Sequence, residues 1–452
     1  MKASRTAIVS AAAAAMIVAS ASTAATTTVS AAPAAADHSV VLVANSNDGP
    51  NNTNTNGSDK NKNKSRQSGG STSSNSNDAS SKNDNKAESS GTGSGASNSN
   101  TKSDSNDNGA KGSGGGKATN TNNGGFLFGG RGEKNKNTAE ANGSGSSSAN
   151  NITGSNNDSN AKSTSGGNAS NNVTGDNNGS LHAESNGPQS FAGNYINGNN
   201  NNTDSKANGA NSEAYADVTG GNNDIDSRAS NGGYAEGVVA GAGNNTNGYR
   251  NKLNVTGNNG FAQGFAFGND NKVNSTATNT NGGASIATAE GNRNKVDAVA
   301  TGAGSLAIAG ATGDDNKISA TNTNGGTSGL ATAAALGSRN DVSAKSSGND
   351  SVAFSGVKGN NSKASSIADG VGSTATSSVN ASNAKAESEA HNGGTAEATA
   401  NRPGSYAKAY AIGSGASATA VTATNPANDS ATVNCTGGGH AVAVAGNKVK
   451  FC

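Results

Sequence analysis

The feature that most restricts the fold of this chain is a repeat between Gly268 and Lys358. Each of its four segments begins with a glycine, usually as G-x-x-N, and contains two short alternating runs separated by a glycine-containing turn. The starting glycines, Gly268, Gly291, Gly313 and Gly337, lie 23, 22 and 24 residues apart. Two alternating runs per about 22 residues are typical of β-strands, whereas the frequent glycines disfavour helix. The repeat therefore predicts an all-β fold, a β-solenoid or β-roll in which each coil adds strands to growing parallel sheets.

Weaker copies of the same start extend the repeat toward both ends of the chain. They begin at Gly132, Gly154, Gly175, Gly198, Gly220 and Gly248, and a degenerate copy begins at Gly359. The sixth position of the copies changes in character along the chain. The earlier copies hold Asn137, Ser159, Ser180 and Thr203 there. From Ile225 onward the position is aliphatic, so we predict that an inward-facing column begins at this residue. Its members are Ile225, Leu253, Val273, Val296, Ile318 and Val342.

The composition is compatible with a repetitive fold and not with several compact domains. Only 30% of the 452 residues are hydrophobic, 3% are aromatic, and glycine occurs 65 times. Such a chain buries too little apolar surface to offset the entropy of ordering a compact core. It is therefore either disordered or built from units that contact only their neighbours. The net charge of +1 offers no basic excess to a phosphate backbone, so no nucleic acid partner is expected.

The N-terminus is typical of a secretory signal peptide. Lys2 and Arg5 precede an apolar stretch of small residues over 7–21, and the small residues at 34–36 suit cleavage before Asp37. We therefore expect a secreted or cell-surface protein that keeps no transmembrane anchor after cleavage. The predicted organisation is a signal peptide at 1–36, a disordered Asn/Ser/Gly-rich spacer at 37–131, weak polar repeats at 132–219, core solenoid repeats at 220–380, degenerate Ala-rich repeats at 381–434 and a disulfide-closed cap at 435–452.

Each repeat start contains an asparagine, and these asparagines form a column if the coils stack in register. Asparagine tolerates left-handed backbone, hydrogen-bonds its own turn and can form amide ladders when stacked. We predict a structural ladder here, with ligand binding by the row as the less favoured alternative. The members of the ladder are Asn251, Asn271, Asn294, Asn316 and Asn340.

The columns on either side of these asparagines differ in their charge pattern. The preceding column alternates in sign, as expected when stacked charges have opposite neighbours. It contains Arg250, Asp270, Arg293, Asp315 and Arg339. The following column does not alternate, and its long side chains can splay into water. It contains Lys252, Lys272, Lys295 and Lys317.

The second run of each repeat is apolar on both of its faces. Leu306 and Ile308, for example, alternate with Ala307 and Ala309. One face can fill the interior of the coil, and the other then meets solvent, another chain or another sheet. We favour the arrangement in which the alanines face solvent.

The last segment differs from the repeats and contains the two cysteines of the chain, Cys435 and Cys452. Alternating apolar residues on both sides of a Gly-Asn turn predict a β-hairpin between them. Two cysteines in an exported chain are expected to pair. Such a disulfide would stabilise the fold by on the order of 3 kcal/mol, and the hairpin would cap the open end of the solenoid.

No segment of the sequence meets the requirements of a catalytic or cofactor site. The glycine-rich stretch before Lys117 lacks the spacing of a phosphate loop, and Asp104–Gly109 lacks the glutamate and helices of a calcium loop. The four histidines are scattered singly, without a partner at metal-ligand spacing. Turn residues Asp270, Asp314 and Asp315 could hold calcium only weakly, since the nonapeptide of calcium-binding rolls is missing. We therefore expect no catalytic residues, no cofactor and no metal.

Ala-rich segments such as GSLAIAG, DSVAFSG and GSYAKAYAIGSGASATA resemble the head repeats of trimeric autotransporter adhesins, in which S-x-A-x-G motifs build a β-roll. The resemblance covers the Ala-rich halves of the repeats between Ile225 and Ala423, and the repeat period departs from that of the adhesin heads. It implies secretion and a β-roll, whereas the coiled-coil stalk and anchor of the family are not found in this sequence. The long Ala-rich signal and cystine-closed tail are also similar to uncharacterised exported actinobacterial proteins, which implies no activity.

These features predict an exported structural or adhesive component of the cell surface or extracellular matrix, without catalytic activity. The alternative is a binding module that recognises polysaccharide, or ice, through flat arrays of threonine and asparagine. The partner would be another copy of the chain in the first case and a surface polysaccharide in the second. The first hypothesis predicts self-association without a soluble ligand, and the second predicts a regular Thr or Asn array on one sheet face.

Overall fold

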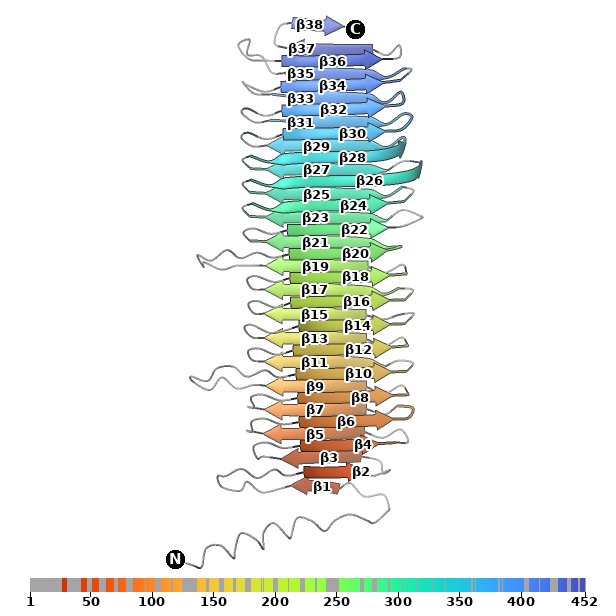
Figure 1. The fold of residues 1–452 in the computed structure, drawn as a ribbon, viewed down its shortest axis with the longest axis vertical. Coiled ribbons are helices and arrows are strands. Elements are labelled where there is room, and N and C mark those ends of the chain that lie inside the picture. The colour runs from red at the N-terminus through yellow and green to blue at the C-terminus, as the bar shows by residue number, and fades with distance from the viewer. Residues whose placement is uncertain are drawn as a thin grey trace, which may run out of the picture.

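The computed structural model describes the strands and most of the turns between Thr27 and Phe451, with side chains from Lys64 onward apart from some near strand ends. The stretches of five or more residues outside this description are 1–26, 31–41, 57–61, 79–83, 102–106, 124–135, 175–179, 241–251 and 423–429, and Cys452 also lies outside it. The described residues contain strands and turns and no helix. The strands stack into one elongated column with β1 and β38 at its opposite ends (Figure 1).

The strands divide into two sheets according to whether their number is even or odd. The even sheet contains β2 (Leu42–Ser46), β4 (Lys62–Gln67), β6 (Asp84–Ser90), β8 (Asp107–Ser113), β10 (Lys136–Asn142), β12 (Asp158–Thr164), β14 (Ser180–Asn186), β16 (Asn202–Asn208), β18 (Asp224–Ser230), β20 (Lys252–Asn258), β22 (Lys272–Thr278), β24 (Lys295–Thr301), β26 (Lys317–Thr327), β28 (Asp341–Asn349), β30 (Lys363–Asp369), β32 (Lys385–His391), β34 (Tyr406–Ile412) and β36 (Ser430–Thr436). The odd sheet contains β1 (Thr27–Ser30), β3 (Asn51–Asn56), β5 (Thr72–Asp78), β7 (Gly95–Thr101), β9 (Lys117–Asn123), β11 (Ser147–Thr153), β13 (Asn168–Thr174), β15 (Phe191–Asn197), β17 (Glu213–Thr219), β19 (Tyr234–Ala240), β21 (Phe261–Phe267), β23 (Ala284–Glu290), β25 (Leu306–Thr312), β27 (Leu330–Leu336), β29 (Val352–Lys358), β31 (Thr374–Val379), β33 (Thr395–Ala400), β35 (Ser417–Thr422), β37 (His440–Ala445) and β38 (Lys448–Phe451).

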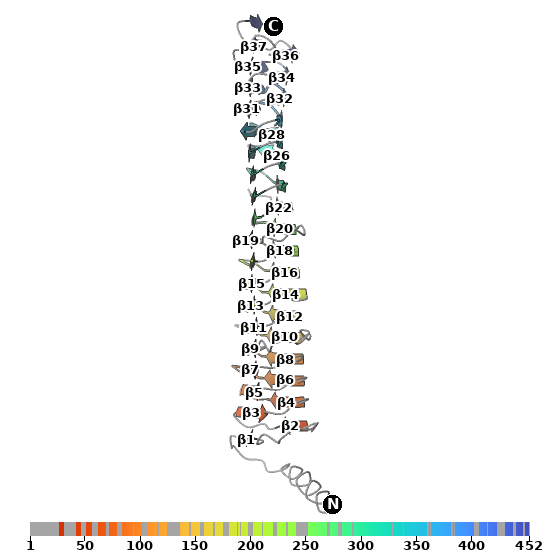
Figure 2. The same ribbon diagram turned by 90° about the vertical axis from the view of Figure 1, so that its left-hand side faces the viewer.

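Each strand pairs in parallel with the equivalent strands of the coils before and after it. In the even sheet, for example, Val273 is opposite Val296, and Val296 is opposite Ile318. Only β38 runs antiparallel, against β37. The side view shows that the two sheets lie face to face, so that the molecule is thin and has two broad outer faces (Figure 2). The predicted all-β solenoid with repeats of about 22 residues is confirmed.

The second, fourth and sixth residues of a typical strand point inward, because side chains of a strand alternate between its two faces. Strand β24 shows the pattern, with Val296, Ala298 and Ala300 fully buried. The structure places all six residues of the predicted inward column in the interior, each at most 1% exposed. They are Ile225, Leu253, Val273, Val296, Ile318 and Val342.

The favoured orientation of the second run is wrong. In β25 the interior takes Ala307 and Ala309, while Leu306 and Ile308 point outward and are only half-buried. The reason is the narrow space between the sheets. Large side chains from one sheet fit there only where the facing side chains of the other sheet are small. A Cβ placed on inward-facing Gly237, for example, would lie 2.4 Å from Cδ1 of Leu253.

The aliphatic core also begins earlier than predicted. Ser159 of β12 is opposite Leu181 of β14, so Leu181 and not Ser180 occupies the inward column in that coil. The continuous core cluster reaches back to Val173 of β13. Counting six positions from the repeat start gives Ser180 because the turn before β14 is one residue longer than the turn before β12.

Within the predicted spacer at 37–131, strands β4 to β9 continue the same two sheets. Their interior positions hold residues such as Asn85, Asn98 and Asn120, all at most 1% exposed, together with buried alanines and serines. The sequence appeared too polar to fold because these asparagines find hydrogen-bond partners only when the coils stack.

The glycines that begin the repeats lie where the odd strands turn into the even strands. Gly291 has φ of 122°, and its N–H donates to the carbonyl of Thr312 in the next coil over 2.8 Å. A Cβ on this residue would lie 2.0 Å from the carbonyl oxygen of Gly268 directly beneath it. Both the backbone conformation and the close stacking therefore require glycine here.

Candidate functional site

The predicted asparagine ladder lies along this glycine edge and bonds mainly to backbone. The amide Nδ2 of Asn294 donates to the carbonyl of Gly291 over 2.6 Å, which closes its own turn. The Oδ1 of Asn316 accepts from the backbone N–H of Asn294 over 2.9 Å, and Asn340 repeats both contacts one coil further on. Asn251 and Asn271 lie outside the described residues. The described part of the column is occupied in holding the turns together.

The left-handed backbone of these turns falls on the residue before the asparagine. Arg293, Asp315 and Arg339 have φ of 58°, 59° and 59°. Residues with a branched or long side chain rarely adopt this conformation. Arg293 and Asp315 face each other from adjacent coils with 3.8 Å between Nε and Oδ2, in keeping with the predicted sign alternation. Arg250 and Asp270 of the same column lie outside the described residues.

A second asparagine ladder, which the sequence analysis missed, runs through the interior of the odd sheet. Its side-chain amides bond to one another from coil to coil, with Nδ2 to Oδ1 distances of 2.9–3.4 Å. It ends where Asn194 meets Ala216, and the Nδ2 of Asn194 is buried without a partner. The regular recurrence of asparagine in the second run was the signal that could have revealed it. Its members are Asn75, Asn98, Asn120, Asn150, Asn171 and Asn194.

The outer face of the odd sheet carries large apolar side chains between β21 and β29, and we call this surface the apolar face. Several of them are more than a third exposed, including Phe267, Leu336 and Phe354. The others are half-buried against their neighbours. The apolar face consists of Phe261, Phe265, Phe267, Ile286, Leu306, Ile308, Leu330, Leu336, Val352 and Phe354.

Aromatic and acidic residues extend this surface toward β15. The rings of Tyr234 and Phe261 stack in parallel with their centroids 5.2 Å apart. The Tyr234 hydroxyl donates to Glu236 and lies 3.0 Å from Oε1 of Gln263. Burial, together with the nearby carboxylates, raises the pKa of Tyr215 to about 12. Each of the two stacked rings therefore covers one face of the other.

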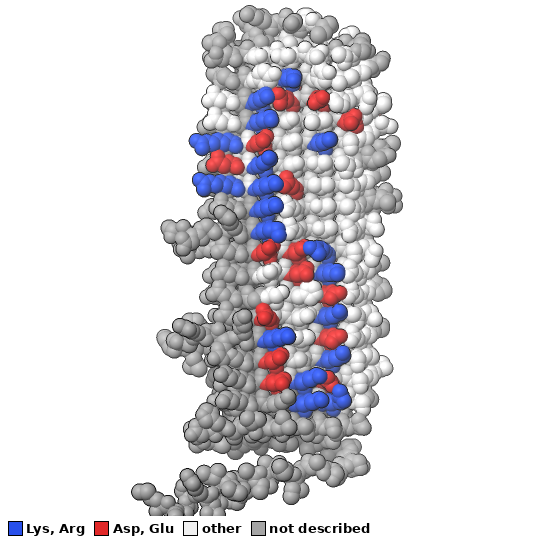
Figure 3. Space-filling view, in the orientation of Figure 1, with Lys and Arg blue, Asp and Glu red and all other residues white. Residues whose placement is uncertain are grey.

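The outer face of the even sheet is polar and carries its charges in columns (Figure 3). The fifth residues of β4 to β16 alternate in sign, and we call them the alternating column. Arg66 pairs with Glu88 at 2.8 Å, Lys111 with Glu140 at 3.4 Å and Lys162 with Glu184 at 3.5 Å. The column contains Arg66, Glu88, Lys111, Glu140, Lys162, Glu184 and Lys206.

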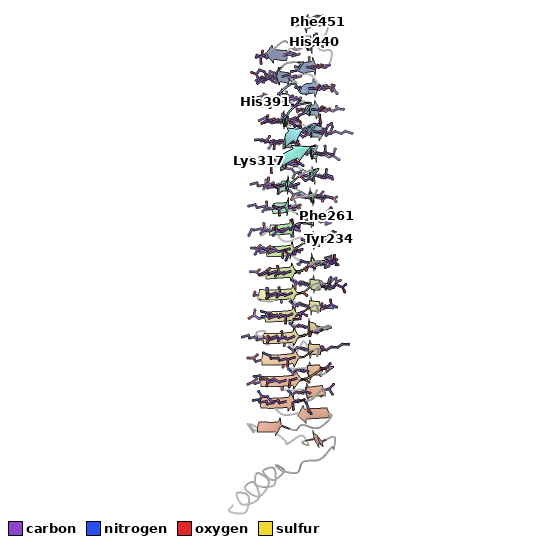
Figure 4. The ribbon with its side chains drawn as sticks, turned by 90° about the vertical axis from the view of Figure 1, so that its right-hand side faces the viewer. Tyr234, Phe261, Lys317, His391, His440 and Phe451 are labelled. Atoms are coloured by element: carbon purple, nitrogen blue, oxygen red, sulfur yellow. The ribbon has the colours of Figure 1, made fainter. Side chains whose placement is uncertain are left out.

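The first residues of β20, β22, β24 and β26 form a different column, which consists of Lys252, Lys272, Lys295 and Lys317. We call it the lysine column. Figure 4 shows Lys317 pointing away from the side on which Tyr234 and Phe261 lie, so the two surfaces are on opposite faces. Small polar residues occupy most of the other outward positions of these four strands, including Thr276, Thr278 and Thr301. Threonines and asparagines thus lie beside the lysine column on this face.

The histidines do not gather into one site. His182 lies 3.2 Å from Asp204 of the next coil and 3.5 Å from Glu184, and the hydrogen bond to Asp204 raises the pKa of its imidazole. His391 contacts Glu389 and Asp369 in a similar arrangement near the other end. His38 lies outside the described residues. Among the described side chains, no group of three or more His, Cys, Asp or Glu is arranged to hold a metal ion.

The C-terminal hairpin is present, with Val442 opposite Phe451 and Val444 opposite Val449. Strand β38 pairs along the edge of β37 that the parallel stack leaves open. Cys435 lies in β36, but its side chain and the whole of Cys452 are outside the description, so the disulfide stays a prediction.

Comparison with known proteins assigns no family. No protein-family profile, no curated protein and no solved structure matches this chain. No helix in the described part is long and apolar enough to cross a membrane. The resemblance to adhesin heads therefore depends on the solenoid geometry and the quoted motifs alone.

Proposed function

We propose that this chain is a non-catalytic structural or adhesive protein of the cell surface or extracellular matrix, and that copies of it associate through the apolar face. The observation that carries the proposal is the inverted packing of the odd sheet. Alanines fill the interior, while the largest side chains of the same strands point outward. In the single chain these side chains stay partly in water, so covering them with a partner would gain free energy.

Half of the chain's few phenylalanines lie on the apolar face. The chain has eight phenylalanines and no tryptophan, and the apolar face holds Phe261, Phe265, Phe267 and Phe354. Contiguous exposed apolar patches mark interaction surfaces, whereas single exposed apolar residues need no explanation. The even sheet has no comparable surface among its described strands, where Val299, Ile367, Tyr410 and Ile412 stand out among polar residues.

The area is sufficient for a stable contact between two copies. The apolar face itself, five rungs from β21 to β29 with strands about 23 Å long, covers roughly 550 Å², and its extension to β15 brings the surface to roughly 900 Å². Standard interfaces bury about 800 Å² on each partner. Two sheets can also pack face to face with about 10 Å between them, as in β-sandwiches. A second copy therefore fits this surface in both size and shape.

The extracellular setting of the proposal comes from the signal-like N-terminus, and the adhesive role gains support from the resemblance to adhesin heads. A flat, rigid column is also suited to a structural role, because each coil contacts only its neighbours and the length can vary without changing the fold.

Sedimentation of the mature protein tests the proposal. We expect concentration-dependent association of the unmodified chain, and a monomer for the double variant Phe265→Ser, Phe354→Ser. The matched control, Val299→Ser with Ile367→Ser on the even sheet, should still associate. A monomeric unmodified chain at its highest soluble concentration would overturn the proposed self-association.

A further inference from the structure

The lysine column departs from the alternation of charge that the alternating column shows. Stacked rungs of a parallel sheet lie about 4.8 Å apart, so like charges at the same position of successive strands repel. The alternating column avoids this repulsion over seven successive coils. Lys252, Lys272, Lys295 and Lys317 instead place four positive charges in succession. After Asp341, the same position holds Lys363 and Lys385.

Intramolecular counter-charges do not account for the arrangement. Lys252 lies 3.5 Å from Asp224, and Lys295 lies 3.5 Å from Asp297, but both ammonium-bearing side chains remain half exposed. Within the described part of the chain, no ion pair reaches Lys272 or Lys317. Such exposed pairs contribute little and leave the ammonium groups accessible to another molecule.

The surface beside the column is suited to hydroxyl groups. In these four strands the outward positions other than the lysines hold Asn, Asp, Ser, Thr and one valine, and no aromatic ring. Some of these side chains form ladders, with Asn274 Nδ2 donating to Asn254 Oδ1 over 2.8 Å and Thr278 to Asn258 Oδ1 over 2.7 Å. The hydrogen-bonding groups of these outward side chains that the ladders do not use are available to another molecule.

We propose that the lysine column binds a linear anionic polysaccharide that lies along the solenoid axis. The ammonium groups would meet the carboxylate or sulfate groups of successive sugars, and the neighbouring amides and hydroxyls would bond the sugar hydroxyls. Single-stranded nucleic acid fits this surface less well, because its binding sites usually supply aromatic rings on which bases stack. The site lies on the sheet opposite the apolar face, so it stands independently of the proposed self-association.

Binding of the mature full-length chain to immobilised alginate tests this proposal, with uncharged dextran and a single-stranded DNA oligonucleotide as comparison probes. We expect binding to alginate that weakens as salt is raised, because exposed charges are screened. We expect no binding to dextran and weaker binding to DNA. Failure to bind alginate at low salt, equal binding to dextran, or tighter binding to DNA would each overturn the proposal.

The variant Lys272→Glu separates binding from folding. It places a carboxylate between Lys252 and Lys295, so it should raise the melting temperature by removing repulsion, yet it should weaken alginate binding roughly ten-fold. The double variant Lys272→Gln, Lys317→Gln should weaken binding similarly without adding a negative charge. The control Lys358→Glu makes the same charge change on the opposite sheet and should bind normally. Unchanged binding by both lysine-column variants, or an equal loss in the control, contradicts the assignment.

Discussion

The coils before and after Asn194 share one backbone architecture but fill their interiors with opposite chemistry. From β5 to β15 the middle of the odd strands holds a ladder of hydrogen-bonded asparagines. From β17 onward the same position holds alanine, glycine or serine, and from β18 to β28 the facing strands supply Ile, Leu or Val. The fold is therefore specified by the turns and the period, since either interior can be built on it.

The two interiors differ in what stabilises them. Burial of aliphatic side chains contributes about 25 cal/mol per Å² of apolar surface, and it requires no partner of fixed geometry. A buried amide instead gains only about 0.5–1.5 kcal/mol per hydrogen bond and costs more if any partner is lost. We infer that the apolar coils are the stable part and that the asparagine coils form by adding rungs to them.

The largest expected effect comes from placing a charge in the apolar interior. Val296→Asp buries a carboxylate among aliphatic side chains, and we expect the free energy of unfolding to fall by several kcal/mol. The control Thr301→Asp lies on the outer face of the same strand and should be tolerated. Thermal melting followed by circular dichroism compares the two, and equal losses would show that the interior is wrongly assigned.

The asparagine interior can be tested in the same way. Asn171 makes four side-chain hydrogen bonds, to Asn150, Ser159, Asn194 and the carbonyl of His182. Asn171→Ala leaves these buried groups without partners, and we expect a loss of about 2–4 kcal/mol. Asn172→Ala, next to it on the outer face, should change stability little. Similar unfolding midpoints in urea for both variants would mean that the ladder does not stabilise the coils.

A smaller effect is expected from overfilling the narrow interior near β19. Gly237→Ala places its Cβ against Leu253, and such overpacking costs about 1–3 kcal/mol. Leu253→Val should relieve the clash, so the double variant should be more stable than the sum of the single changes predicts. Strict additivity in a double-mutant cycle would show that the two residues do not share this space.

The smallest expected effect is the pH dependence of the stability that the contact between His182 and Asp204 provides. Its hydrogen bond to Asp204 raises the pKa of the imidazole in the folded state. The resulting stabilisation is complete below the ordinary histidine pKa and is lost as pH rises through the raised value. Asp204, Glu184 and Lys162 are the charged groups beside it. The melting-temperature difference between the unmodified chain and His182→Gln should therefore shrink from pH 5.5 to pH 8, and a constant difference would contradict the contact.

The sequence was sufficient to predict the period, the strands of the core repeats and the inward position of the six aliphatic residues from Ile225 to Val342, although the aliphatic core begins earlier. It did not predict that Ala307 and not Leu306 faces inward, because alternation gives two equivalent faces and only the distance between the sheets chooses one. It also did not predict the coils around Asn98, since a buried asparagine and a solvated one look alike until the neighbouring coil supplies its partner. The first miss concerns the packing of the two facing sheets, and the second concerns contacts between coils about 22 residues apart. Local patterns contain neither.

The columns on the outer faces were only partly predictable. The sign alternation at Arg293 and Asp315 could be predicted, because these residues lie at clear repeat starts. The alternating column could not be predicted, because it lies in coils whose repeat starts are weak. The apolar face could not be assigned before the interior was known, because it consists of the side chains that the interior leaves out.

Hydrogen exchange of the intact mature protein, followed by mass spectrometry, tests the central claim most directly. The claim is that one continuous solenoid runs through both regions and that its stability follows the chemistry of its interior. We expect slow exchange in the strands from β18 to β35, and measurable but weaker protection in β6 to β13. Exchange in β6 to β13 as fast as in an unfolded peptide, or protection there equal to that of β18 to β35, would contradict the account.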